Sequence, residues 1–183
     1  MLRLRALRVA RNSRKPFGAK STSTWCRRKH VSITLEKIRA LVDQGYVWIS
    51  DHGYDELADD GLTAREVVRG VAEYTLVEDY PNFGKGPRVL TLHRDNEDNR
   101  VHAVWGIPVG RTGPKPLGRR LPTEAVMARK RTKLIHEGDF VAEVDIELLE
   151  EGDGWSPCLS TADAYRLDDV REALRTGNLS AAA

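Results

Sequence analysis

The apolar positions between residues 33 and 107 repeat first with the period of a helix and later with the period of strands. Ile38, Leu41 and Val42 share one helical face, whereas residues 100–107 alternate as a strand buried on one side does. In chain order the pattern predicts helix 33–43, strand 46–50, a short helix 52–58, a helix from Thr63, and strands 75–80, 88–93 and 100–107. This order predicts an α+β fold, in which one small antiparallel sheet carries helices on one face.

The helix that begins at Thr63 has its own start signal. Thr63 and Glu66 have the spacing of a capping box, in which the threonine oxygen accepts an amide hydrogen bond and the glutamate reaches back to the threonine amide. Val67, Val68 and Val71 then form its buried side.

The pattern changes after residue 107. Four prolines and three glycines between residues 108 and 125 prevent a long helix and indicate a linker. After Met127, residues 132–150 predict a β-hairpin. One or two short helices should follow it, ending at Gly177. Their predicted buried residues are Leu167, Val170, Ala173 and Leu174.

Charge is distributed unevenly along the chain, although the net charge is only +2. Residues 1–30 hold ten Lys or Arg and no carboxylate, and residues 137–183 are mainly acidic. Such asymmetry suggests a basic part for polyanions and an acidic part that covers it, although ordinary solvated charge explains it equally well.

The basic first segment has the Arg- and Ser-rich composition of an organelle transit peptide. We favour a disordered tail, because nothing in the segment predicts a core. The sequence predicts four parts, which are a disordered basic tail at 1–31, an α+β domain at 32–107, a linker at 108–126 and an acidic module at 127–183.

Several classes of protein and site are disfavoured. No run of about 18 apolar residues occurs, so no membrane-spanning helix is expected. Cys26 and Cys158 lie in unrelated contexts, which disfavours a disulfide framework or a zinc site and fits a reducing cytoplasm. No phosphate-binding loop or nucleophilic-serine motif is present. We expect a cytoplasmic protein with no membrane partner, no cofactor and no metal.

The predicted α+β domain at residues 32–107, here called the first unit, contains three histidines, a residue type that titrates near neutral pH. Strand alternation places His102 on the face opposite Trp105, and it separates His93 from the face of Arg88, so His93 is the weaker candidate. His52 lies at a helix N-terminus, which favours a neutral imidazole. His52 and His102 within reach of one phosphate alongside Arg88 would suit RNA cleavage, with a base at the ribose 2′ hydroxyl and a guanidinium at the phosphate. The alternative is that both histidines are hydrogen-bonded residues of the fold.

Other cations could contact RNA phosphates, with Tyr80, Phe83 or Trp105 available for base stacking. The expected RNA-binding residues are Arg65, Arg69, Lys85 and Arg100. Ordinary solvated charge is an equally good explanation for the two arginines on the helix.

Four blocks of sequence resemble the domain-of-unknown-function family DUF4258, a group of short prokaryotic proteins related to RelE- and BrnT-like toxins. The blocks are His52-Gly-Tyr-Asp-Glu-Leu-Ala-Asp-Asp-Gly-Leu62, Val77-Glu-Asp-Tyr-Pro81, Gly86-Pro-Arg-Val-Leu90 and Val101-His-Ala-Val-Trp105. The similarity covers residues 33–110. The recurring positions of the family fall on His52, Gly61, Arg88 and His102, and Gly53 stands where members commonly have alanine. The resemblance implies a toxin fold with endoribonuclease activity on mRNA, including ribosome-associated mRNA.

The segment from Met127 resembles small antitoxin-like proteins encoded beside such toxins. The resemblance implies a fused toxin–antitoxin pair, in which a tether of about twenty residues holds the acidic module near the basic domain. Charge complementarity would then let the module mask the toxin domain. The alternatives are a non-catalytic RNA- or protein-binding module and an inactive degenerate fusion.

Overall fold

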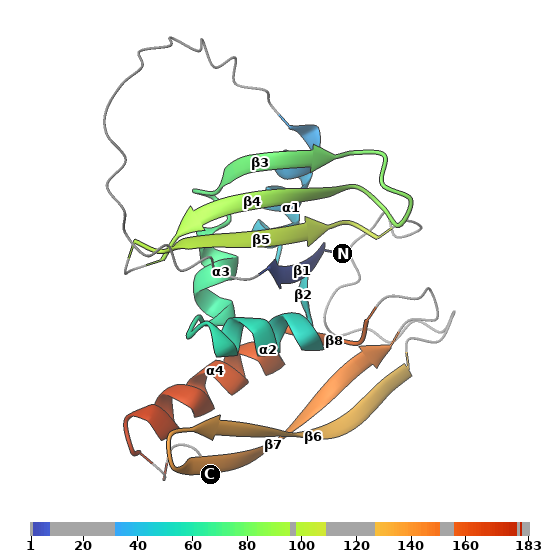
Figure 1. Cartoon of the computed structure of the whole chain (residues 1–183). Helices are drawn as coiled ribbons and strands as arrows, with labels where there is room; N and C mark the ends of the chain where they lie inside the picture. The colour runs from blue at the N-terminus through green and yellow to red at the C-terminus, as the bar shows by residue number, and fades with distance from the viewer. Residues whose placement is uncertain are drawn as a thin grey trace, which may run out of the picture.

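The computed structural model describes residues 2–7, 32–95, 98–108, 127–150, 156–178 and 180. The elements are β1 (Leu2–Leu7), α1 (Ile33–Asp43), β2 (Val47–Ser50), α2 (Asp51–Asp59), α3 (Ala64–Gly70), β3 (Thr75–Tyr80), β4 (Arg88–Arg94), β5 (Arg100–Gly106), β6 (Met127–Glu137), β7 (Phe140–Glu150), β8 (Cys158–Ser160) and α4 (Thr161–Arg175). Within the described part of the chain, eight strands form one sheet in the order β3-β4-β5-β1-β2-β8-β7-β6 (Figure 1). The predicted α+β class is confirmed.

The middle of the sheet is built from segments that are far apart in sequence. Strands β3, β4 and β5 form the predicted antiparallel meander. Strand β2 has β1 on one side, paired in parallel, and β8 on the other, paired antiparallel. Both neighbours of β2 therefore come from outside the predicted domain at residues 32–107.

The expectation of a disordered tail is wrong for residues 2–7. These residues form β1, which lies between β5 and β2 in the sheet. Leucine and arginine alternate in this segment with the period of a strand, but its Arg-rich composition favoured a tail. Residues 8–31 lie outside the described residues, as do residues 109–126 of the predicted linker.

One hydrophobic core runs through both of the modules that the sequence suggested. The core includes Ile38 of α1, Leu57 of α2, Val67 of α3 and Leu167 of α4, each of which is at most 1% exposed. The valines predicted for α3 and the apolar stripe predicted for α4 are all buried. The stripe lies on one helix of 15 residues, where the sequence predicted one or two short ones.

Helix starts follow the local sequence. Each helix begins after a serine or threonine whose side chain accepts a backbone amide hydrogen bond, and these residues are Ser32, Ser50, Thr63 and Ser160. The predicted capping box of Thr63 and Glu66 is present with both of its hydrogen bonds. No described helix combines the length and apolarity that crossing a membrane requires.

Strands β4 and β5 bury one face and leave the other half-buried. Val89, Val101 and Trp105 lie in the core on the buried face, where α1 also packs. The other face is called the open face here, and in Figure 1 α1 lies behind the strands that carry it. Its residues are Arg88, Leu90, Leu92, Arg94, Arg100, His102 and Val104.

Candidate functional site

The open face carries cations at both ends and an imidazole between them. Arg94 lies directly opposite Arg100 on the neighbouring strand, and Leu92 lies directly opposite His102. Arg94 and Arg100 are exposed, and His102 is half-buried. Directly opposite residues of an antiparallel pair point to the same face. The three polar side chains therefore form one continuous group on the open face.

Arg88 occupies the other end of this face and is held by aromatic rings. Its guanidinium carbon lies 3.5 Å from the centre of the Phe83 ring and 4.9 Å from that of Tyr80. These two rings, expected to stack on RNA bases, therefore contact Arg88. The stacking role expected for Trp105 is wrong, since Trp105 is 0% exposed and its indole donates to the Thr91 hydroxyl.

The residues predicted to be catalytic lie on three different elements, α2, β4 and β5. His52 lies on α2, is 61% exposed and has its Nε2 atom 3.2 Å from the Glu56 carboxylate. Helix α2 packs against the core, whereas His102 lies on the open face. Leu92 on β4 lies directly opposite His102, and Arg88 is four residues before Leu92 on the same strand. Four residues correspond to about 13 Å at the rise of a strand. His102 and Arg88 thus share the open face, and His52 lies on a different element.

The residues predicted to bind RNA lie on three different parts of the chain, which are α3, the loop between β3 and β4, and β5. Arg65 belongs to α3, and its guanidinium lies 3.0 Å from the Asp169 carboxylate and 5.1 Å from the centre of the Tyr165 ring. Arg69 is also on α3, and Lys85 is in the loop between β3 and β4. Arg100 alone among the four lies on the open face.

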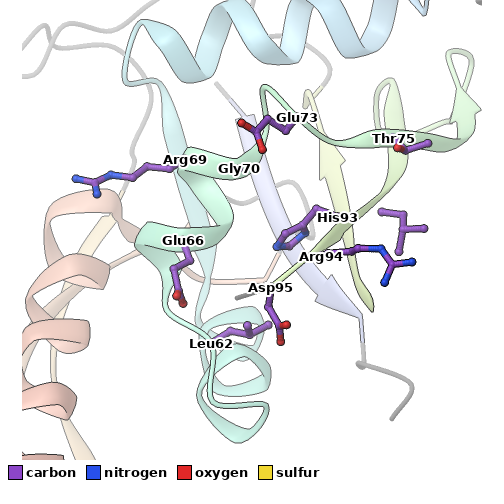
Figure 2. A pocket seen from close by; sticks show the side chains of 10 residues that line it. Leu62, Glu66, Arg69, Gly70, Glu73, Thr75, His93, Arg94 and Asp95 are labelled. Carbon is purple, nitrogen blue, oxygen red and sulfur yellow. The ribbon is translucent and has the colours of Figure 1, made fainter. Parts of the chain in front are cut away.

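His93, the weaker candidate from sequence, lines a cavity of about 500 Å³ between α3 and the end of β4 (Figure 2). Its ring stacks on Tyr74 with 4.4 Å between ring centres. Its Nδ1 atom is buried and has no hydrogen-bond partner among the described residues. Burial lowers the pKa of His93, although the charges of Asp95 and Glu66 act in the opposite direction. Alternation predicted the face of His93 correctly, but only the packing of α3 beside β4 creates the cavity.

The lowered pKa of His93 predicts a loss of stability in acid. The ordinary histidine pKa is 6.5 and burial moves the folded-state value below it, so the unfolded chain binds the proton more tightly. The contribution of His93 to the free energy of unfolding should be fully present above the unfolded-state pKa of 6.5. It should be lost as the pH falls from there to the folded-state pKa. Melting temperatures at about pH 7.5 and about pH 5.5 should show a smaller acid loss in His93→Gln than in the wild type. Equal losses in the two proteins would contradict the assignment.

Two side chains of α4 form hydrogen bonds with backbone groups near the end of α2 and the start of α3. The Asp168 carboxylate accepts hydrogen bonds from the backbone amides of Ala64 at 3.2 Å and Arg65 at 3.0 Å, at the start of α3. Arg171 donates to the carbonyl oxygens of Ala58 at 2.9 Å and Leu62 at 3.0 Å. Burial raises the pKa of Asp168, while the two backbone hydrogen bonds lower it. The C-terminal segment thus makes hydrogen bonds to backbone groups near the end of α2 and at the start of α3.

In the ion pairs between β6 and α2, the charges are arranged in the opposite way to the expected masking, in which acidic residues of the C-terminal module would cover basic residues of the first unit. The Lys133 ammonium lies 2.6 Å from a carboxylate oxygen of Asp51 and 2.6 Å from one of Asp55. Arg131 adds a contact of 3.1 Å to Asp51. Basic residues of the C-terminal segment therefore meet acidic residues of the first unit. Apart from the backbone pairing of β8 with β2, the polar contacts described above between this segment and the first unit are on α2, on α3 and in the loop between them, and none of these is on the open face.

No group of three or more His, Cys, Asp or Glu within the described ranges could hold a metal ion.

In comparisons with known proteins, no curated protein and no solved structure matches the chain. One family model does match, described as Domain of unknown function (DUF4258), over residues 49–112. This stretch runs from within β2 to beyond β5 and contains the open face and His93. Residues 49–112, the part of the chain that carries the candidate site, thus match the DUF4258 family.

Proposed function

We propose that the chain is an RNA-binding protein of the toxin–antitoxin type, with a RelE/BrnT-like domain that holds single-stranded RNA on its open face. The observation that supports this most is the pair of arginines, Arg94 and Arg100, directly opposite each other on that face. Like charges in this position destabilise a sheet. Asp98 offsets part of the repulsion through an exposed ion pair with Arg94, and phosphate groups would offset the rest.

Cleavage of the bound RNA is the second part of the proposal, and it is assigned to His102 without His52. His102 lies between the arginine pair and Arg88 on the face where the phosphates would lie. Its imidazole would take the proton of a ribose 2′ hydroxyl. The 2′ oxygen would bond to phosphorus, the bond to the 5′ oxygen would break, and water would protonate that leaving oxygen. The product ends would be a cyclic phosphate and a 5′ hydroxyl.

In this proposal, the antitoxin-like segment at residues 127–183 is an intramolecular partner docked against the helices. The buried contacts of Asp168 and Arg171 with α2 and α3 support this arrangement. Because these contacts lie away from the open face, the segment would support the RNA-binding domain and leave its arginines available.

Binding can be tested by fluorescence anisotropy with a labelled single-stranded RNA and the full chain. Arg100→Gln should weaken binding and lower the slope of log affinity against log salt by about 0.7, the value for one phosphate contact on a single strand. Arg129→Gln is the matched control, because Arg129 is an exposed arginine on β6. Equal effects of the two substitutions would indicate non-specific attraction and contradict the proposed surface.

Cleavage can be tested on the same RNA. His102→Ala should slow cleavage by about 10²- to 10⁴-fold, the usual contribution of a general base, with binding nearly unchanged. His52→Ala should leave the rate unchanged, because His52 lies on α2 with Glu56. If the wild type binds RNA without cleaving it, the catalytic part fails. A non-catalytic RNA-binding module then remains, a candidate that the separation of His52 and Arg88 from His102 already favours.

A further inference from the structure

We propose that the cavity around His93 binds a small organic cation, an ammonium or guanidinium group carried on a short alkyl chain. The cavity lies between α3, the turn that follows it, and the end of β4 (Figure 2). Its volume of about 500 Å³ falls within the range of small-molecule sites. Two lining residues, Leu92 and Arg94, also belong to the open face, but this inference does not rest on the RNA binding proposed there.

The charge around the cavity favours a cation. Glu66, Glu73 and Asp95 all line it. The charges of Glu66 and Asp95 both act on His93, so their carboxylates lie near the imidazole. Figure 2 shows the side chains of the two lining arginines, Arg69 and Arg94, directed away from His93. The field at the imidazole is therefore dominated by carboxylates.

The imidazole itself is suited to this role. Burial lowers its pKa, so at neutral pH it adds no positive charge that would oppose a cation. A histidine with a purely structural role is normally hydrogen-bonded through its buried nitrogen. The Nδ1 atom of His93 has no such partner among the described residues. The position of the ring is instead set by stacking on Tyr74.

Part of the cavity wall is apolar, as an alkyl chain with a cationic end requires. Leu62 lines one side and is buried. Tyr74, which supports His93, packs directly on Gly70, where an added Cβ atom would lie 2.8 Å from the tyrosine ring. Tyr74 also donates a hydrogen bond to the backbone carbonyl of Val67. Gly70 therefore allows the tyrosine to sit against α3 and hold the imidazole in place.

The test is a titration of the full chain with agmatine, which carries a guanidinium and an ammonium group on a four-carbon chain. The imidazole resonances of His93, observed by NMR, should shift and saturate. The pKa of His93 should fall further in the complex, because a bound cation opposes protonation. Sodium chloride at equal ionic strength and 1,4-butanediol, a neutral analogue, should produce neither effect.

A pair of matched variants separates the cavity from general attraction. Glu73→Gln should weaken agmatine binding by about three- to fivefold, the upper range for an exposed ion pair. Glu147→Gln removes the same charge from an exposed position on β7 and should leave the affinity unchanged. A lack of saturation, an equal response to salt, or equal effects of the two substitutions would overturn the proposal. So would saturable binding of inorganic phosphate or guanosine monophosphate at His93 without binding of agmatine.

Discussion

Replacing Arg171 by alanine is expected to lower the free energy of unfolding by about 3–5 kcal/mol, the usual cost of removing one partner from a buried charged network. The Arg171 side chain is buried and donates to two backbone carbonyls, those of Ala58 and Leu62, and its Nε lies 3.0 Å from the Glu137 carboxylate. The substitution would leave both carbonyls without this donor. Urea denaturation of the full chain, followed by circular dichroism, measures the loss.

Arg175→Ala is the matched control for this prediction. Arg175 contacts the same Glu137 carboxylate at 3.3 Å, but its side chain is 46% exposed. An exposed ion pair is worth at most about 1 kcal/mol. Similar losses for the two variants would mean that the Arg171 network does not join α4 to α2 as strongly as its geometry indicates.

Removing both ends of the chain should abolish cooperative folding, although the sequence suggested an independent domain within residues 32–107. In a fragment of residues 32–126, β2 would lose β1 and β8, its partners on both sides. The start of α3 would lose the Asp168 carboxylate, and the core would lose Leu159 and Leu167. We expect the fragment to show no sigmoidal transition in urea or on heating.

A chain that ends at residue 178 is the control for this fragment, because it keeps every strand and the whole of α4. It should unfold at nearly the same urea concentration as the full chain. A fragment of residues 32–126 that unfolds cooperatively and gives dispersed NMR resonances would show that the domain is independent after all. Tests of toxicity should therefore use substitutions in the full chain, where loss of effect is not confused with loss of fold.

Sequence alone predicted the elements whose signals are local. The capping box of Thr63 and Glu66 needs only four residues, and the burial of Val101, Ala103 and Trp105 follows from alternation within one strand. The pairing of β2 with β1 and β8 depends on contacts across more than 40 and more than 100 residues respectively. Such pairing is decided by the whole core and has no local signal.

For the candidate site too, sequence predicted the local features and missed those that depend on long-range packing. Alternation placed His102 on the open face, but no period in the sequence reveals that α2 packs into the common core or that His52 lies beside Glu56 on this helix. The charge pattern distinguishes basic segments from acidic ones. It did not predict that Lys133 would pair with Asp51 and Asp55, because contacts depend on which residues the fold brings together.

The most direct test of the central claim is to map RNA binding on the full, isotope-labelled chain by NMR. Adding a single-stranded RNA should shift the backbone amide resonances of β4 and β5 and the imidazole resonances of His102, in proportion to occupancy. Resonances of β6 and β7 should remain in place. Shifts confined to α3 or to the β6–β7 hairpin, with β4 and β5 unaffected, would contradict an RNA-binding surface on the open face.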